Sequence, residues 1–216
     1  SGGHTEFTIV KGFNRYHRIG TTVDDALGEA FDKTARLLKL KYPGGPEIEK
    51  LAKKGDETKY DFPKPMIHEK NCYFSFSGLK SSVSQLITKQ NKMTQKKKAD
   101  IAASFQKTVG EIIKVKMGRA ISEFASLNSK KNPTIVVAGG VAANQYLRKI
   151  LKSFEDSHCA NVFFPSLQYC TDNAAMIAYA GLIRFEKKKF SKLSFKPRPR
   201  WPLDDKAVFV KGKGTR

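Results

Sequence analysis

The spacing of apolar and polar residues predicts β-structure followed by a helix in the first part of the chain. Residues 5–10 and 16–23 are β-rich and are joined by Lys11–Arg15, which predicts a hairpin with a loop of about five residues. Apolar residues then recur at helical spacing, so Asp24 is expected to cap a helix. Tyr42–Pro46, with two glycines between two prolines, ends this helix.

The middle of the chain has a mainly helical pattern. A short helix over 47–54 precedes a polar, proline-bearing loop over 55–70, and Tyr73–Phe76 has the composition of a short strand. Residues 81–127 have helical periodicity that is interrupted near a group of lysines, which indicates two helices. The sequence therefore predicts a mainly helical insertion over about 55–130.

The last part of the chain alternates strands and helices. Residues 134–138 and 161–164 are apolar runs typical of buried strands, and helices are expected from near Asn144 and from Thr171. Small residues over 174–181 would let the last helix pack closely at the floor of a cleft. The order predicts a parallel sheet covered by helices.

The order of the elements predicts an α/β fold class, a ribonuclease-H-like half of an actin-like fold with a mainly helical insertion. Residues 1–186 would form that half, and residues 187–216 a basic, proline-containing tail. The chain opens on a glycine turn that leads into the hairpin, and we interpret this as the loss of a strand, and of a first half, upstream of Ser1.

Charge points to a polyanionic partner. The 216 residues include 40 Lys or Arg and 20 Asp or Glu, a formal net charge of +20. Residues 187–216 hold eleven Lys or Arg against two Asp, so this tail carries +9. The second cluster comprises Lys89, Lys92, Lys96, Lys97 and Lys98. Such clusters favour nucleic acid, because binding phosphates releases counterions, although a solvated surface rich in lysine is the alternative.

Other features of the composition predict a protein of the cytoplasm. No apolar run approaches the roughly 20 residues of a membrane helix, and no signal segment opens the chain. Cys72, Cys159 and Cys170 form no C-x-x-C pair, which indicates reduced thiols.

Two glycine-bearing turns are candidate binding elements. Ser1–Thr5, with the sequence SGGHT, exposes successive N–H groups that can form an anion-binding nest, or it is only a turn. Gly45, between proline-flanked residues, could form a bare shelf for a ligand, with Glu49 one helical turn later, or it is only a helix stop.

Polar side chains near the helix starts have two interpretations each. Asp25, Glu29 and Asp32 share one helical face, either as a solvated acidic stripe or as carboxylates facing a cleft. Asn144 follows a strand and a glycine pair, where it caps a helix or contacts a nucleotide. Asp172 would lie in the first turn of the last helix, where the helix dipole favours it or a divalent cation binds it.

Taken together, these motifs resemble the tRNA N6-adenosine threonylcarbamoyltransferase family, once described as O-sialoglycoprotein endopeptidases. The matching stretches are SGGHT at 1–5, DDALGEAFDKTARLL at 24–38, YPGGP at 42–46, FSFSGLK at 74–80, VVAGGVAAN at 136–144 and TDNAAMIAYAG at 171–181. They cover nearly 180 residues in the family's order, and SGGHT is similar to the bacterial and organellar branch.

The resemblance implies roles for individual residues. Those implied to bind substrate are Ser1, Gly2 and Gly3 at a phosphate, and Asp32, Gly45, Glu49 and Asn144 at the adenylate. Asp172 is implied to bind one divalent metal ion, Fe²⁺ in the first place and Zn²⁺ or Mg²⁺ as alternatives. The family's other metal ligands are two histidines in an upstream His-x-x-x-His motif, which this chain does not contain.

The resemblance also implies an activity. The family transfers a threonylcarbamoyl group from threonylcarbamoyl-AMP to N6 of adenine 37 in tRNAs that read ANN codons, and its partners include a paralogous subunit and an accessory ATPase. Without the upstream half, this chain is expected to be inactive alone.

Two other functions are compatible with parts of the sequence. One is half of an ATP-dependent small-molecule kinase of the same superfamily, against which FSFSGLK and TDNAAM argue. The other is a non-catalytic nucleic-acid-binding module that uses the basic tail and the lysine cluster. No protease signature supports the family's older name.

Overall fold

The computed structural model describes residues 2–128, 132–158, 160–198 and 201–207, so Ser1 and the end of the tail lie outside the described residues. The fold is mixed α/β. Its strands are β1 (Glu6–Gly12), β2 (Arg15–Thr21), β3 (Thr134–Val136) and β4 (Asn161–Phe163). Its helices are α1 (Leu27–Leu37), α2 (Gly44–Ala52), α3 (Ser77–Thr88), α4 (Gln95–Leu127), α5 (Gln145–Lys152), α6 (Phe154–His158) and α7 (Ala174–Glu186), with 3₁₀ turns at Gly140–Ala143 and Leu167–Tyr169.

The N-terminal hairpin has a shorter turn than the sequence predicts. β1 continues to Gly12 and β2 begins at Arg15, so two residues join them rather than five. Asn14 has a φ of 55°, the left-handed conformation that tight hairpin turns require and that asparagine tolerates. The register shifts between Val10 and Gly12, which lets the strand absorb the residues that the sequence assigned to a loop.

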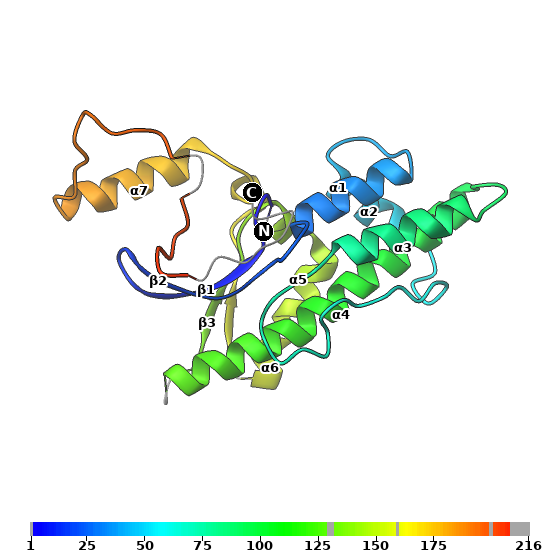
Figure 1. Ribbon diagram of the computed structural model, residues 1–216, viewed down its shortest axis with the longest axis horizontal. Coiled ribbons are helices and arrows are strands. Elements are labelled where there is room, and N and C mark those ends of the chain that lie inside the picture. The colour runs from blue at the N-terminus through cyan, green and yellow to red at the C-terminus, as the bar shows by residue number, and fades with distance from the viewer. Residues whose placement is uncertain (1, 129–131, 159, 199–200, 208–216) are drawn as a thin grey trace.

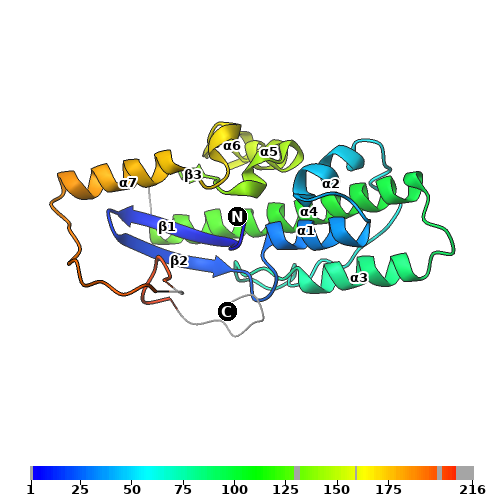
Figure 2. The same cartoon turned by 90° about the horizontal axis from the view of Figure 1, so that it is seen from above.

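Helices α1 to α3 lie at one end of the molecule, and the hairpin and α7 lie at the other, whereas α4 runs from the first end to beside the hairpin (Figures 1 and 2). The two helices predicted within 81–127 are confirmed as α3 and α4, with a break over 89–94. The short helix predicted over 47–54 is α2, which begins earlier, at Gly44. The strand predicted at Tyr73–Phe76 is wrong, because only a single bridge, Thr22 to Phe74, forms there.

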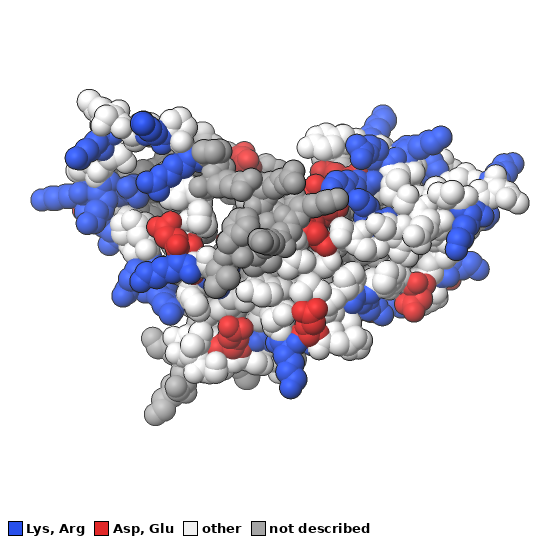
Figure 3. All heavy atoms as spheres, in the orientation of Figure 1, with Lys and Arg blue, Asp and Glu red and all other residues white. Residues whose placement is uncertain are grey.

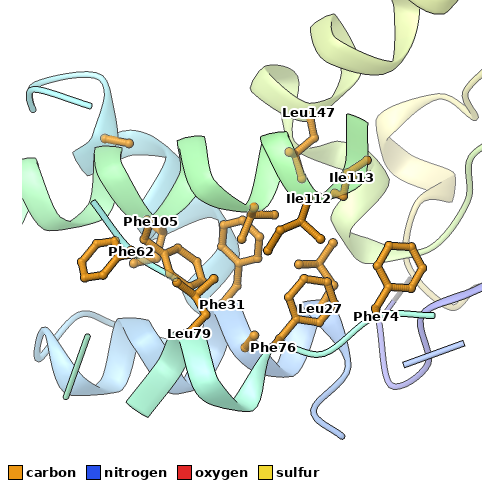
Figure 4. Packing of buried hydrophobic residues seen from close by; sticks show 14 of the residues in the cluster. Leu27, Phe31, Phe62, Phe74, Phe76, Leu79, Phe105, Ile112, Ile113 and Leu147 are labelled. Atoms are coloured by element: carbon orange, nitrogen blue, oxygen red, sulfur yellow. The ribbon is translucent and has the colours of Figure 1, made fainter. Parts of the chain in front are cut away.

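The core lies between α4 and the helices beside it. Figure 4 shows apolar side chains of α1, α3 and α4 pointing toward one another. Phe31 and Phe105 meet edge to face with ring centroids 5.2 Å apart, and neither is more than 1 % exposed. α4 is 33 residues long, so it can pack against α1, α2 and α3 along part of its length and reach the strands with the rest.

The C-terminal strands confirm the parallel pairing but not the predicted burial. β3 and β4 pair in parallel, with Ile135 opposite Val162. Val136 is 70 % exposed and Phe163 57 % exposed, because no described helix covers the outer face of these strands. The close packing expected of the last helix is also absent, since no residue of α7 is buried.

A wide apolar groove separates the two small sheets. β1 pairs only with β2 and β3 only with β4 among the described residues, so each sheet has an open edge. Residues 5–10 and 132–138 line a cavity of about 660 Å³, and its floor is formed by apolar residues of α4, including Ile113, Met117 and Ile121. The two strand pairs therefore do not form one continuous sheet.

Candidate functional site

The glycine turn before β1 lies against the start of α1. A Cβ built at Gly2 or Gly3 would meet nothing within 4 Å, so this backbone is bare on its open side. A Cβ at Gly28 would lie 3.0 Å from the carbonyl oxygen of Gly2, which shows how closely the turn approaches the helix. The Thr5 hydroxyl accepts a 2.8 Å hydrogen bond from the Leu27 amide and so satisfies one donor at the helix start.

Asp32 connects α1 to the proline- and glycine-containing turn. Its Oδ1 accepts a 2.7 Å hydrogen bond from the Gly44 amide at the first residue of α2. A Cβ at Gly44 would lie 2.6 Å from the Cβ of Ala35 and 2.8 Å from the Cα of Asp32, so a side chain cannot fit there. A Cβ at Gly45 would meet nothing within 4 Å, which leaves an open shelf beside Asp32.

Glu49 continues this line of polar contacts to α5. Its Oε1 accepts a 2.9 Å hydrogen bond from the Gln145 amide, at the first residue of α5. Asn144 precedes it and is the helix cap, because its Oδ1 accepts from the Leu147 amide at 2.9 Å. The Asn144 amide also donates to Gln106 Oε1 at 2.9 Å, and both side chains are buried.

A cavity of about 480 Å³ adjoins Glu49 between α2, α4 and α5. Its polar lining includes Glu49, Lys53, Glu57, Gln106, Tyr146 and Lys149. Burial, together with the nearby Glu57 carboxylate, raises the pKa of Tyr146 to about 12. The phenol therefore keeps its proton at neutral pH and acts as a hydrogen-bond donor.

The three acidic residues at the start of α1 divide into a pair that shares Lys33 and one that contacts α2. Lys33 forms ion pairs with Asp25 at 2.8 Å and with Glu29 at 2.6 Å. The hydrogen bond and charge of Lys33 hold the pKa of Glu29 below its usual value. Asp25 is buried and precedes α1, so the interpretation as one solvated stripe is wrong, and Asp32 alone faces the glycine shelf.

Asp172 lies apart from this line, on the segment before α7. Its side chain is exposed, and α7 begins two residues later with Asn173 as its cap, so the expected place in the first helical turn is wrong. Arg148 of α5 donates hydrogen bonds to Pro165 O at 2.8 Å and to Cys170 Sγ at 3.3 Å. These contacts hold residues 165–170 against α5 and so fix the start of the segment that carries Asp172.

These positions can be compared with known proteins. The sequence profile of the tRNA N6-adenosine threonylcarbamoyltransferase family matches residues 1–179. The chain belongs to this family.

Curated relatives with the family name are about half identical to the chain. A tRNA N6-adenosine threonylcarbamoyltransferase of Pelagibacter ubique is 51 % identical over 216 residues, which are the whole chain and 60 % of the relative. Relatives of the same name from Rickettsia rickettsii and Rickettsia bellii are 52 % and 49 % identical over 95 % of the chain and 60 % of their own length. The chain thus spans about 60 % of these threonylcarbamoyltransferases.

The described residues of the chain do not by themselves fit a metal ion. Within them, no group of three His, Cys, Asp or Glu side chains is placed to hold one. Asp172 supplies one carboxylate, and one carboxylate does not hold a divalent ion tightly. Likewise, within the ranges described, no helix is both long and apolar enough to cross a membrane.

The sequence patterns did not identify three residues whose hydrogen bonds hold the site segments in place. Gln106 lies in the apolar face of α4, and Thr5 was noted only as part of SGGHT. Arg148 had no motif at all. For Gln106 the sequence did hold a signal, because a polar residue within the apolar face of a helix must find a hydrogen-bond partner when it is buried.

Proposed function

We propose that the whole protein transfers a threonylcarbamoyl group from threonylcarbamoyl-AMP to N6 of adenine 37 in tRNAs that read ANN codons. Family membership supports this reaction. The observation that carries it at the residue level is the line of contacts from Asp32 through Gly44 to Glu49 and Gln145. This line joins three separate sequence motifs at one side of α2.

The adenylate would lie along this line. The turn at Gly2 and Gly3 lies against the start of α1 and leaves open space where side chains would stand, which suits it to the phosphate, because a helix N-terminus favours negative charge. The Gly2 amide already donates a 2.9 Å hydrogen bond to the His4 carbonyl, so the Gly3 amide is the donor that we assign to the phosphate. Asp32 and Glu49 each commit one carboxylate oxygen to a backbone amide, and the other oxygen hydrogen-bonds to none of the described residues. Those oxygens can accept ribose hydroxyls above the open face of Gly45.

Asn144 would contact the nucleotide with a side chain that the protein holds in place. Its amide is fixed by Leu147 and Gln106, so its side chain has one defined orientation at the edge of the site. Ser1 would extend the phosphate loop. Both interpretations of Asn144, as a cap and as a nucleotide contact, are compatible because the second N–H of the amide remains available.

The transfer itself needs a stabilised leaving group. The N6 amine of adenine attacks the carbamoyl carbon, a C–N bond forms, the bond from that carbon to the phosphate oxygen breaks, and the amine loses a proton. AMP leaves as an anion, and the Gly3 amide of the glycine turn would bind its phosphate. We propose that Asp172 binds a divalent ion, Fe²⁺ before Zn²⁺ or Mg²⁺, with histidines from outside this chain, and we assign no step to that ion.

The same proposal covers the organisation of the whole protein. Residues 1–186 would be one ribonuclease-H-like half of an actin-like fold, with an insertion over about 55–130 and a tail over 187–216. The groove between β1 and β3 supports a further strand from the rest of the protein. The whole protein would act on tRNA in the cytoplasm with a paralogous subunit and an accessory ATPase.

The test is the modification of a tRNA transcript by the whole protein with its partners, measured by mass spectrometry of the nucleosides. Asp172→Ala and Asn144→Ala are expected to lower the rate at least tenfold, and Asp61→Ala, whose side chain is 96 % exposed, should not change it. The 216-residue chain alone is expected to show no transfer. Full activity of both site variants would refute the assignment.

A second function rests on the charge of +20. If the whole protein carrying Asp172→Ala or Asn144→Ala still binds tRNA and, with its partners, modifies tRNA at an unchanged rate, the chain is a non-catalytic module for nucleic acid. The measured rates therefore separate the two proposals.

A further inference from the structure

The C-terminal tail is attached to the hairpin at two points. The amide of Arg18 in β2 donates a 3.0 Å hydrogen bond to Asp204 Oδ2, and His17 Nδ1 lies 3.7 Å from the same carboxylate. At the other end, Lys187 Nζ lies 5.3 Å from the centroid of the Phe13 ring in the hairpin turn. Between these points, residues 188–198 turn back from the end of α7, and residues 201–203 lead to Asp204 (Figure 1).

Positive charge on this segment is not paired with carboxylates within the part of the chain that the structure describes. The exposed cations are Lys187, Lys188, Lys189, Lys192, Lys196 and Arg198. None of them forms an ion pair with a carboxylate of the described residues, and Figure 3 shows lysines and arginines at this end of the molecule as well as at the opposite end. In the other lysine cluster, Lys96 pairs with Asp100 at 2.9 Å, and no ion pair to a described carboxylate is formed by the other four lysines.

Aromatic side chains alternate with these cations. Phe190 is 69 % exposed, Phe195 73 % and Trp201 68 %. Arg198 lies over the Trp201 ring, 4.8 Å from its centroid, which places a cation and a flat apolar surface at one point. Exposed rings between cations are the arrangement that binds single-stranded nucleic acid, because phosphates bind the charges and bases stack on the rings.

We propose that the tail segment, residues 187–198 and 201–203, is a second RNA-binding surface, separate from the nucleotide site, where cations bind phosphates and Phe190, Phe195 and Trp201 stack on unpaired bases. It rests on the proposed function, which supplies an RNA substrate. A folded RNA with a single-stranded loop fits better than a duplex, because a duplex keeps its bases stacked inside.

Trp201 is the chain's only tryptophan, so its fluorescence reports on this surface directly. In a titration of the 216-residue chain with a tRNA transcript, stacking is expected to quench that fluorescence. Inorganic polyphosphate is expected to bind without comparable quenching. Equal quenching by both, or none at saturating tRNA, would contradict stacking.

Two sets of variants separate charge from stacking. The triple change Lys188→Ser, Lys189→Ser and Lys192→Ser should weaken binding at least tenfold and lower the dependence of affinity on salt by about two released ions. The matched triple change of Lys92, Lys97 and Lys98 to Ser, in the other cluster, should have a smaller effect. If the two triple variants weaken tRNA binding equally, the tail is not a preferred binding surface and the proposal is contradicted.

Trp201→Ala should weaken tRNA binding about tenfold, which is the scale of one lost stacking contact, and Trp201→Phe should restore most of it. Full affinity of Trp201→Ala would overturn the stacking role. A mixture of neutral and anionic phospholipid vesicles serves as the competing surface, and vesicle binding that tRNA does not displace would assign the tail to a membrane instead.

The whole protein distinguishes this inference from the proposed function. If Asp172→Ala abolishes modification while Trp201→Ala leaves the KM for tRNA unchanged, the transferase stands and the tail surface is refuted. If the tail binds tRNA but the whole protein modifies none, the tail surface stands and the transferase is refuted.

Discussion

Asp24 is the residue whose position differs most from its sequence interpretation. It does not cap α1, whose N-cap is Ala26. Its carboxylate instead accepts hydrogen bonds from the hydroxyls of Ser75 and Ser77, at 2.5 and 2.6 Å, and from the amides of Phe76 and Ser77. It therefore satisfies donors at the start of α3, more than 50 residues along the chain.

These contacts predict a pH-dependent contribution to stability. Burial raises the pKa of Asp24, but the four hydrogen bonds outweigh it and hold the pKa below its usual value. The contribution is therefore complete above the unfolded pKa of about 4 and is lost as the pH falls through the lower folded value. Asp24→Asn should cost about 1–3 kcal/mol at pH 7, with a smaller difference at pH 3, measured by urea unfolding.

Asp61→Asn is the matched control, since that side chain is almost fully exposed and a change there should stay within about 0.5 kcal/mol. If the stability of Asp24→Asn equals that of the unchanged protein at pH 7, the hydrogen bonds of Asp24 contribute nothing.

At the scale of elements, the packing of α1 against α2 assigns different roles to two adjacent glycines. Gly44 is buried against Ala35 and the backbone of Asp32, whereas Gly45 faces open space. One glycine therefore serves the contact between the helices, and the other serves the shelf that the proposed function gives to the adenylate. The sequence pattern YPGGP treats them alike.

Alanine substitutions should separate these roles. Gly44→Ala should lower stability by about 1–3 kcal/mol, because the new methyl group forces two helices apart. Gly45→Ala should not lower stability, but it should weaken AMP binding by the whole protein, because the methyl group stands on the shelf. Thermal unfolding and calorimetric titration measure the two effects, and unchanged AMP affinity in Gly45→Ala would refute the shelf.

At the scale of the whole molecule, the open edges of β1 and β3 face one apolar groove. Unpaired strand edges are exposed donors and acceptors, and proteins normally cover them. A strand of about five to six residues from the longer protein would pair with both edges and cover the apolar floor on α4. This arrangement would join the two small sheets into one.

Hydrogen exchange tests this arrangement. In the whole protein the amides of 6–12 and 134–136 should exchange more slowly than in the 216-residue chain, because an added strand protects them. The buried amides of α4 provide the internal control and should be protected in both forms. Equal exchange of the strand amides in the two forms would mean that nothing occupies the groove.

Local sequence patterns were enough to predict most of the helices and the family motifs, but they were wrong on the strand at Tyr73–Phe76 and on the length of the hairpin turn. Periodicity predicted α3 and α4, and the alternation of strands and helices predicted the parallel pairing of β3 with β4. The cap at Asn144 was one of two interpretations, and it is confirmed by the bond from the Leu147 amide. The resemblance of six motifs identified the family, which the comparisons confirm. The roles of individual site residues stay predictions.

Contacts between distant segments determine which polar groups meet. The bonds from Asp24 to Ser77 and from Asn144 to Gln106 join positions 53 and 38 residues apart. The exposure of β3 and α7 was equally invisible, because an apolar run is the same whether or not another segment covers it. Local sequence patterns predict whether a segment is a helix or a strand, whereas its burial and its distant partners depend on how the whole chain folds.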